Sequence, residues 1–139
     1  MNVLVDTSVW SIALRRGGPR GTAEERELAA LIAEGRVLMV GAVRQELLSG
    51  VRTEGQFRKL REHLRAFPDA PLAEADYEEA ASCFNRCRAR GVQGSNTDFL
   101  LCAVALRNRA AILTTDKDFS RYARVLHVLL HEPRAVAET

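Results

Sequence analysis

The segment Asn2-Val-Leu-Val-Asp-Thr-Ser-Val-Trp10 decides the fold, because an apolar run ends in a carboxylate that two hydroxyl residues follow. The apolar residues do not alternate with polar ones, which is typical of a strand covered on both faces, as in a parallel sheet between helices. Asp6 then lies at the carboxyl end of the strand, where open α/β sheets place their ligands. Thr7 or Ser8 is expected to cap the following helix. From this segment alone, Asp6 is equally well a cap or turn residue.

Length and composition restrict the class of protein. The 139 residues suffice for a single domain, residues 1–139, whose core needs no disulfide or structural metal. A formal net charge of +2 does not by itself indicate a nucleic-acid-binding protein. Cys83, Cys87 and Cys102 lack metal-ligand spacing, which favours reduced core thiols over a zinc site. No apolar stretch approaches the length of a membrane span and no signal peptide precedes the first strand, so we expect a cytoplasmic protein.

Strand and helix patterns alternate along the rest of the chain. Val37–Val40, Ala111–Thr115 and a segment near Val125–Leu130 are predicted strands. Predicted helices separate them, two of which begin with capping boxes at Thr22 and Thr53. This alternation predicts a three-layer α/β/α sandwich with a central, mainly parallel sheet of four to five strands. The helix predicted from residue 74 is expected to face inward through Tyr77, Ala80, Ala81 and Phe84.

Four carboxylates are expected to meet at one edge of this sheet. Asp6 and Asp116 each follow a predicted strand, and parallel strands all end on the same side. Asp98 lies in the first turn of a helix that is apolar nearly all round, and Glu46 neighbours the buried side of the helix after the second strand. Such acids repel one another unless a cation lies between them, which predicts a raised carboxylate pKa in the metal-free protein. Oxygen ligands without histidine or cysteine indicate Mg²⁺ or Mn²⁺.

Polar residues near these acids have two interpretations each. Four hydroxyl residues orient the carboxylates or contact phosphate oxygens, with capping and strand-end roles as the alternative: Thr7, Ser8, Thr114 and Thr115. Asp118 is either the N-cap of the helix at Phe119 or an additional acid at the metal. Three arginines of the loop after the first helix contact RNA or belong to a solvated loop: Arg15, Arg16 and Arg20.

Four segments resemble, in order and spacing, the motifs of PIN-domain nucleases, and most closely those of VapC-type toxins from toxin–antitoxin pairs: Asp6-Thr-Ser-Val-Trp10, Glu46-Leu-Leu-Ser-Gly50, Asp98-Phe-Leu-Leu-Cys-Ala103 and Thr114-Thr-Asp-Lys-Asp-Phe119. A single motif of this kind also occurs by chance in unrelated proteins. The four motifs in this order, however, cover essentially the whole chain. The resemblance implies a Mg²⁺- or Mn²⁺-dependent endoribonuclease that a cognate antitoxin inhibits and that is usually a homodimer. It implies metal ligands at Asp6, Glu46, Asp98 and Asp116, with Asp118 as an acidic neighbour. Cys102 departs from the pattern, in which small or aliphatic residues are commoner.

Other classes fit the sequence less well. The main alternative is a catalytically silent PIN-like module that binds RNA or protein through arginine-rich faces, and the presence of all four acids argues against it. A phosphatase with Asp6 as nucleophile would need a second carboxylate two residues later, where the chain has Ser8. The resemblance also suggests that an antitoxin binds near Trp10, Leu14 and the helices within residues 42–66, although Trp10 is at least as well explained as a core aromatic.

Overall fold

A short parallel sheet lies at the centre of the molecule. The computed structural model describes residues 1–15 and 21–135. Strands β1 (Val3–Val5), β2 (Val37–Leu38) and β3 (Ala111–Leu113) pair in parallel in the order β2-β1-β3. The first strand is therefore the middle strand, and its three residues are buried, as the unbroken apolar run predicts. This register brings the carboxyl ends of β1 and β3 side by side.

The predicted count of four to five strands is wrong, because the described residues form three strands. The segment predicted as the last strand, Val125–Leu130, instead begins inside helix α7 (Asp118–Leu126). His127 then ends the helix in the left-handed conformation, with φ of 61°. At the sheet, Leu130 forms an isolated parallel bridge with Ile112, whose N–H donates to the Leu129 carbonyl (2.9 Å) and whose carbonyl accepts from the His131 N–H (2.7 Å). The extended chain passes along β3 here without building a full strand.

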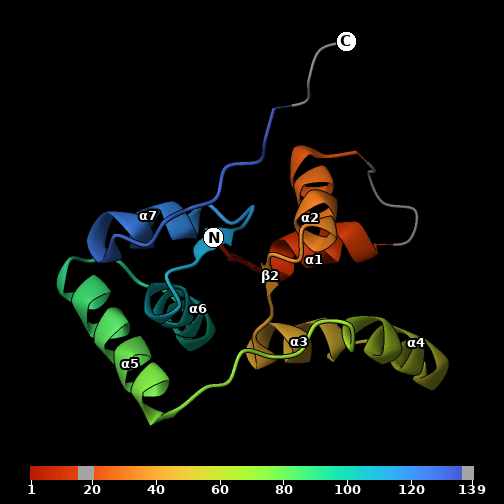
Figure 1. Cartoon of the computed structure of the whole chain (residues 1–139). Coiled ribbons are helices and arrows are strands. Elements are labelled where there is room, and N and C mark those ends of the chain that lie inside the picture. The colour runs from red at the N-terminus through yellow and green to blue at the C-terminus, as the bar shows by residue number, and fades with distance from the viewer. Residues whose placement is uncertain (16–20, 136–139) are drawn as a thin grey trace.

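Helices cover both faces of the sheet, which confirms the predicted three-layer arrangement. Helix α6 (Asn96–Arg107) packs on β1 and β3, and α5 (Glu74–Ala89) packs on α6. On the other side, α1 (Thr7–Leu14) contacts α2 (Ala23–Ala33) and α3 (Gly41–Leu48), and α4 (Glu54–Leu64) extends from α3. Figure 1 shows α5, α6 and α7 on one side of the strands and α1 to α4 on the other. Along the described part of the chain, no helix is long and apolar enough to cross a membrane.

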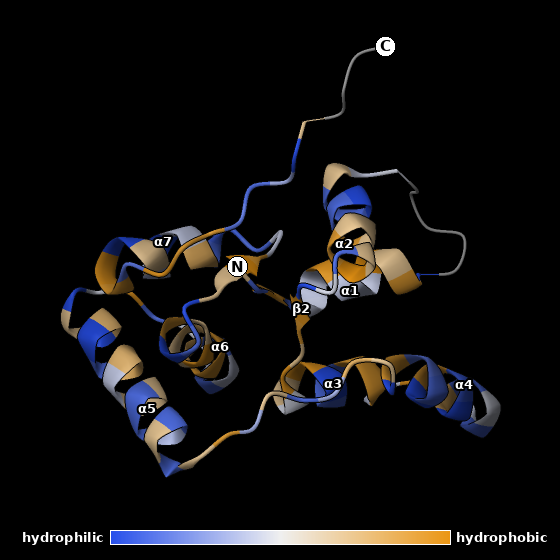
Figure 2. Cartoon of the chain, viewed as in Figure 1, coloured by the Kyte–Doolittle hydropathy of each residue, from blue (hydrophilic) through white to orange (hydrophobic). Residues whose placement is uncertain are grey.

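Local sequence signals explain where several helices begin. The hydroxyls of Thr22 and Thr53 accept hydrogen bonds from the backbone N–H groups of Glu25 and Gln56, as their capping boxes predict. Helix α6 is mostly buried because its residues are apolar nearly all round. Figure 2 shows hydrophobic residues concentrated on the strands and α6, whereas α4 is mostly hydrophilic.

The inward face of α5 differs from the predicted one. Tyr77 is 57% exposed, and the buried residues are Asp76, Cys83 and Cys87. The Asp76 carboxylate accepts hydrogen bonds from the Ala73 N–H (2.8 Å) and from Arg107 Nε of α6 (2.9 Å), which satisfies its buried charge. Of the residues predicted to face inward, Tyr77 and Ala81 are exposed, whereas Ala80 and Phe84 pack against the core, and the Phe84 ring lies edge-on to Phe99 at 5.5 Å. The cysteines are free and buried, as predicted.

Candidate active site

The carboxylate of Asp6 is fixed where β1 and β3 end together. The Asp6 N–H donates to the Leu113 carbonyl (2.9 Å), so the residues that follow the two strands lie next to each other. The Thr114 hydroxyl donates to Asp6 Oδ2 at 2.8 Å, and the Ser8 hydroxyl from the first turn of α1 donates to the same oxygen at 2.9 Å. Two neighbouring hydroxyls, whose oxygens lie 3.4 Å apart, thus orient one carboxylate oxygen.

Hydrogen bonds continue from Thr114 into the segment that carries Asp116. The Asp116 N–H donates to Thr114 Oγ1 at 2.9 Å, and the Thr115 N–H donates to Ser8 Oγ at 3.1 Å. The Asp118 N–H in turn donates to Asp116 Oδ1 at 2.9 Å. The strand end, the start of α1 and the start of α7 therefore form one connected network.

Asp98 is held at the start of α6 by two groups. Its backbone N–H donates to the Ser95 hydroxyl (3.0 Å), and the Tyr122 hydroxyl of α7 donates to Asp98 Oδ2 (2.7 Å). Burial raises the pKa of Asp98; hydrogen bonds from Tyr122 and Ser95 lower it, and the charges of Asp6 and Asp116 raise it again. The pKa of Asp98 stays above its ordinary value, chiefly because the carboxyl is partly buried and to a lesser extent because of the like charges.

The negative charge of these three acids has no cationic counterpart in the described structure. Asp6 is only 7% exposed, and the groups that bond its carboxylate are neutral hydroxyls. Within residues 1–15 and 21–135, no ion pair involves Asp6, Asp98 or Asp116. A buried carboxylate without a charged partner favours the binding of a cation, and oxygen donors suit a hard one.

The acids do not form a complete ligand cage as they stand. In the part of the chain that the structure describes, no group of three or more acidic, histidine or cysteine side chains is arranged to hold a metal ion. Magnesium in particular is commonly bound through one or two carboxylates and keeps several waters. The residues therefore fit a partly hydrated divalent ion better than an ion enclosed by protein.

Glu46 is not part of the hydrogen-bond network that connects Asp6 and Asp116. It is exposed on α3, and its carboxylate makes no hydrogen bond or ion pair with any described residue. Asp118 does not cap α7, because Lys117 occupies the N-cap position. Instead the Asp118 carboxylate pairs with Arg121 at 2.8 Å, and both side chains are about half exposed.

The hydroxyl residues also differ from one another. Neither Thr7 nor Ser8 caps α1, since Asp6 is the N-cap residue and no side chain makes a capping bond there. Ser8 and Thr114 orient Asp6, whereas the buried Thr7 hydroxyl has no hydrogen-bond partner among the described residues. Thr115 is exposed and contributes its backbone N–H.

Two further expectations concern the first helix. Trp10 is fully buried and packs edge-on against Phe67 with ring centroids 5.2 Å apart, so it is a core aromatic and not part of a surface groove. Arg15 is exposed at the end of α1, and Arg16 and Arg20 lie outside the described residues.

Sequence reasoning missed Tyr122, Ser95 and Gly94, which together position Asp98. Ser95 carries a readable signal, because a serine three residues before an acid at a helix start is a typical N-cap. The spacing of Phe119, Tyr122 and Leu126 predicts a buried face of α7, but not the partner of the Tyr122 hydroxyl. A side chain at Gly94 would bring Cβ within 2.7 Å of Tyr122 Cζ, so glycine is needed for this close approach.

Comparisons with known proteins agree with this architecture. The family model described as PIN domain matches residues 3–125, from β1 into the last turn of α7. A protein named VapC ribonuclease Mb1587, from Mycobacterium bovis, is 30% identical over 128 residues, which are 91% of this chain and 95% of that protein. Ribonuclease VapC11 from Mycobacterium tuberculosis has the same identity and coverage.

Solved structures with the same fold include toxin–antitoxin complexes. The crystal structure of FitAcB from Neisseria gonorrhoeae has a chain that matches with a TM-score of 0.75 at 20% identity, covering 94% of this chain and 97% of that one. A chain of VapBC2 from Rickettsia felis, bound to a DNA fragment from its promoter, matches with a TM-score of 0.75 at 18% identity and covers 94% and 98% of the two chains. At these identities the likeness establishes the shared fold.

Proposed function

This chain belongs to the PIN-domain family, among the VapC ribonucleases, and from that membership we propose that it is a metal-dependent endoribonuclease and the toxin of a toxin–antitoxin pair. The observation that supports this most strongly is the buried carboxylate of Asp6, which neutral hydroxyls orient and no described cation balances. Asp98 and Asp116 lie close enough for their charges to interact, since the charges of Asp6 and Asp116 both raise the pKa of Asp98. In this proposal, residues 1–139 form a single PIN-like nuclease domain that cleaves RNA.

The residues have separable roles in this proposal. Asp6, Asp98 and Asp116 would hold Mg²⁺ or Mn²⁺, and we propose Glu46 as a fourth acid, whose exposed carboxylate is free of other partners. When bound, the ion supplies Lewis acidity, which activates water and stabilises charge on the phosphodiester during its in-line displacement. Asp118 is a further acid near the ion, since its N–H already bonds Asp116.

Hydrogen bonds prepare two of the acids for this role. Ser8 and Thr114 occupy Oδ2 of Asp6, and the Asp118 N–H occupies Oδ1 of Asp116. The second oxygen of each carboxylate makes no hydrogen bond within the described structure. Each acid is thus fixed through one oxygen and offers the other, which reduces the rearrangement that ligand binding requires.

RNA and a small protein are the proposed partners. Exposed Arg15 supports contact with the substrate's phosphates near the acids, and we extend this role to Arg16 and Arg20 from the sequence. The hydroxyl of exposed Thr115 is a further candidate contact. The structural neighbours named as VapBC and FitAB complexes support a cognate antitoxin. We also propose that the protein forms a homodimer and is located in the cytoplasm. Light scattering on the purified chain tests whether it is a dimer.

The proposal is tested by substituting Asp98 in the purified protein. Asp98→Asn removes the charge but keeps the shape and the Tyr122 contact, so we expect an intact fold by circular dichroism and loss of RNA cleavage in Mg²⁺ or Mn²⁺. Glu62→Gln is the matched control, because Glu62 is exposed on α4 and pairs only with Arg65. Full cleavage by Asp98→Asn would contradict the mechanism, and RNA binding without any cleavage by the unsubstituted protein would favour the silent binding module.

A further inference from the structure

A second pocket opens directly beside the acids. Its volume is 180 Å³, and Thr114 and Asp116 belong both to its lining and to the network around Asp6. The remaining walls come from the start of α2, the first turn of α7 and the chain after Leu130. A ligand bound at the acids can therefore place an adjacent part of its structure in this pocket.

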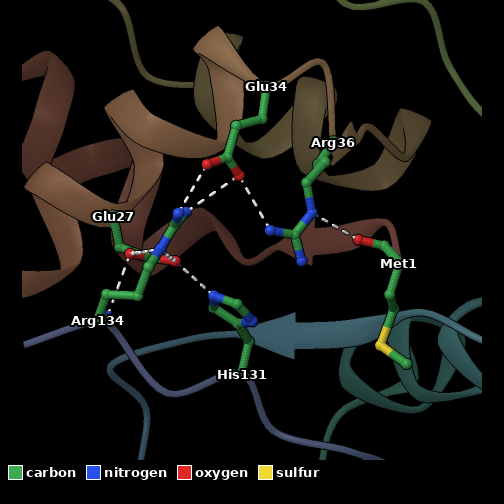
Figure 3. A network of polar contacts seen from close by, with 6 residues as sticks. All are labelled: Met1, Glu27, Glu34, Arg36, His131 and Arg134. Atoms are coloured by element: carbon green, nitrogen blue, oxygen red, sulfur yellow. Dashed lines mark hydrogen bonds and ion pairs between the residues drawn. The ribbon is translucent and has the colours of Figure 1, made fainter.

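The wall formed by the C-terminal segment, residues 129–134, is rigidly held. His131 Nε2 lies 2.6 Å from Glu27 Oε2, and Arg134 Nε lies 3.0 Å from Glu27 Oε1. Arg134 also pairs with Glu34 of α2. Figure 3 shows His131 and Arg134 directed from this segment toward Glu27 and Glu34. Because Glu27 is only 3% exposed, this contact fixes the segment against α2 and so keeps the pocket open.

The size and lining of the pocket suit one flat ring. A cavity of about 150 Å³ accepts a benzene ring, so the 180 Å³ of this pocket has room for a single small ring system. Leu130 and Pro133 supply apolar contacts, and Ser120 and Lys117 supply hydrogen-bonding groups. An unstacked RNA base presents this combination of an apolar face and a polar edge.

The charge of the pocket lining determines which part of an RNA strand, phosphate or base, fits into the pocket. Glu24, Glu132 and Asp116 line the pocket and oppose the entry of a phosphate, whereas Lys117 is the single lysine at its edge. Carboxylates accept hydrogen bonds from exocyclic amino groups, such as N4 of cytosine, whereas the O4 carbonyl of uracil would need a donor such as Lys117, Ser120 or Thr115; with three carboxylates and one lysine, the excess negative charge of the lining favours a donating base edge. The lining therefore favours a base that carries an amino group.

We propose that this pocket binds the base of a nucleotide next to the scissile phosphodiester and selects cytosine over uracil. The inference rests on the proposed ribonuclease function for the identity of the strand, but it concerns binding and not cleavage. Glu132 and Glu24 are the specificity-determining residues, and Ser120 lies on the α7 side of the pocket.

Binding of short RNA to the Asp98→Asn protein in Mg²⁺ tests the pocket without cleavage. We expect fluorescence anisotropy to give a pentacytidine Kd at least about fivefold below that of pentauridine, the lower end of what one base-edge contact contributes. Ser120→Trp fills the pocket from an exposed position and should remove this preference, and Glu132→Gln should reduce it. Ser82→Trp, at an exposed position of α5, is the matched control and should change neither Kd.

The outcomes separate this inference from the proposed function. Equal affinities for the two pentamers, or a preference that survives Ser120→Trp, would overturn the base pocket even if the protein cleaves RNA. A preference that Ser120→Trp abolishes supports the pocket even if the unsubstituted protein cleaves nothing. Cytidine monophosphate is titrated in parallel, and tighter binding of it than of pentacytidine would assign the pocket to a free nucleotide and contradict the proposal.

Discussion

At the scale of single residues, the decisive feature is a buried carboxylate, Asp6, whose partners are hydroxyls and not cations. Ser8 and Thr114 bond the same oxygen, so they define the direction in which the other oxygen points. Neutral donors orient the charge without cancelling it, which leaves the site able to attract a metal ion.

Ser8→Ala tests this orientation. The substitution removes the bond to Asp6 Oδ2 and the acceptor of the Thr115 N–H, while Thr114 still bonds Asp6. We expect cleavage to fall about tenfold, as for other groups that orient metal ligands, with an unchanged circular dichroism spectrum. Ser82→Ala on α5 is the control and should cleave normally; an equal loss in both variants would show that the effect is not specific to Asp6.

Glu27 provides a prediction for the pH dependence of stability. Burial raises its pKa, but hydrogen bonds from Arg134 and His131 lower it from 4.5 to about 2. Because the folded pKa lies below the unfolded one, ionised Glu27 stabilises the fold fully above about pH 4.5, and this contribution is lost as the pH falls from about 4.5 to about 2.

Glu27→Gln isolates that contribution. At pH 7 we expect the variant to lower the free energy of unfolding by about 2 kcal/mol, because charged hydrogen bonds are lost from a buried site. In urea titrations the difference from the unsubstituted protein should shrink between pH 5 and pH 3. A constant difference over this range would contradict the role of the Glu27 charge. Glu62→Gln, on exposed α4, should remain close to the unsubstituted protein throughout.

At the scale of elements, the site depends on the contact between α6 and α7. Tyr122 of α7 bonds Asp98 of α6, and Gly94 before α6 leaves room for the tyrosine ring. The spacing of apolar residues carries a local signal for the buried face of α7, although the segment from Val125 is predicted as a strand. It does not predict the Tyr122–Asp98 contact, which depends on how the two helices pack.

Gly94→Ala is expected to be destabilising for this reason. Its Cβ would lie 2.7 Å from Tyr122 Cζ, and the resulting shift should cost about 1–3 kcal/mol in thermal or urea unfolding. Gly55→Ala on α4 is the matched control, since its Cβ meets nothing within 4 Å and alanine favours the helix. We expect the two variants to change stability in opposite directions; stabilisation by Gly94→Ala would contradict the close approach.

At the scale of the whole molecule, the sequence predicts the layers better than the details of the sheet. The apolar runs of β1 and β3 and the acids that follow them are readable, because parallel strands end at a common edge. The predicted last strand fails because α7 continues to Leu126 and His127 turns the chain, so that the following segment forms a single isolated bridge with β3 at Leu130. The expected face of α5 is correct only for Ala80 and Phe84, and the burial of Asp76 is not predicted, since its partner Arg107 is distant in sequence.

This extended C-terminal segment connects the fold to the proposed specificity of the site. It is too short to be a strand, yet Glu27 and Glu34 hold it beside Asp116, where it completes a pocket. Prediction of this arrangement would require the pairing of residues about one hundred positions apart, and local patterns in the sequence do not contain that information.

The most direct test of the central claim is RNA cleavage by one preparation of the purified protein, measured with Mg²⁺, with Mn²⁺ and with excess chelator. The carboxylates around Asp6 have no described cationic partner, so we expect cleavage only when a divalent ion is present, and its recovery when Mg²⁺ or Mn²⁺ is added back in excess of the chelator. Undiminished cleavage in the chelator would contradict a metal-dependent mechanism at these acids.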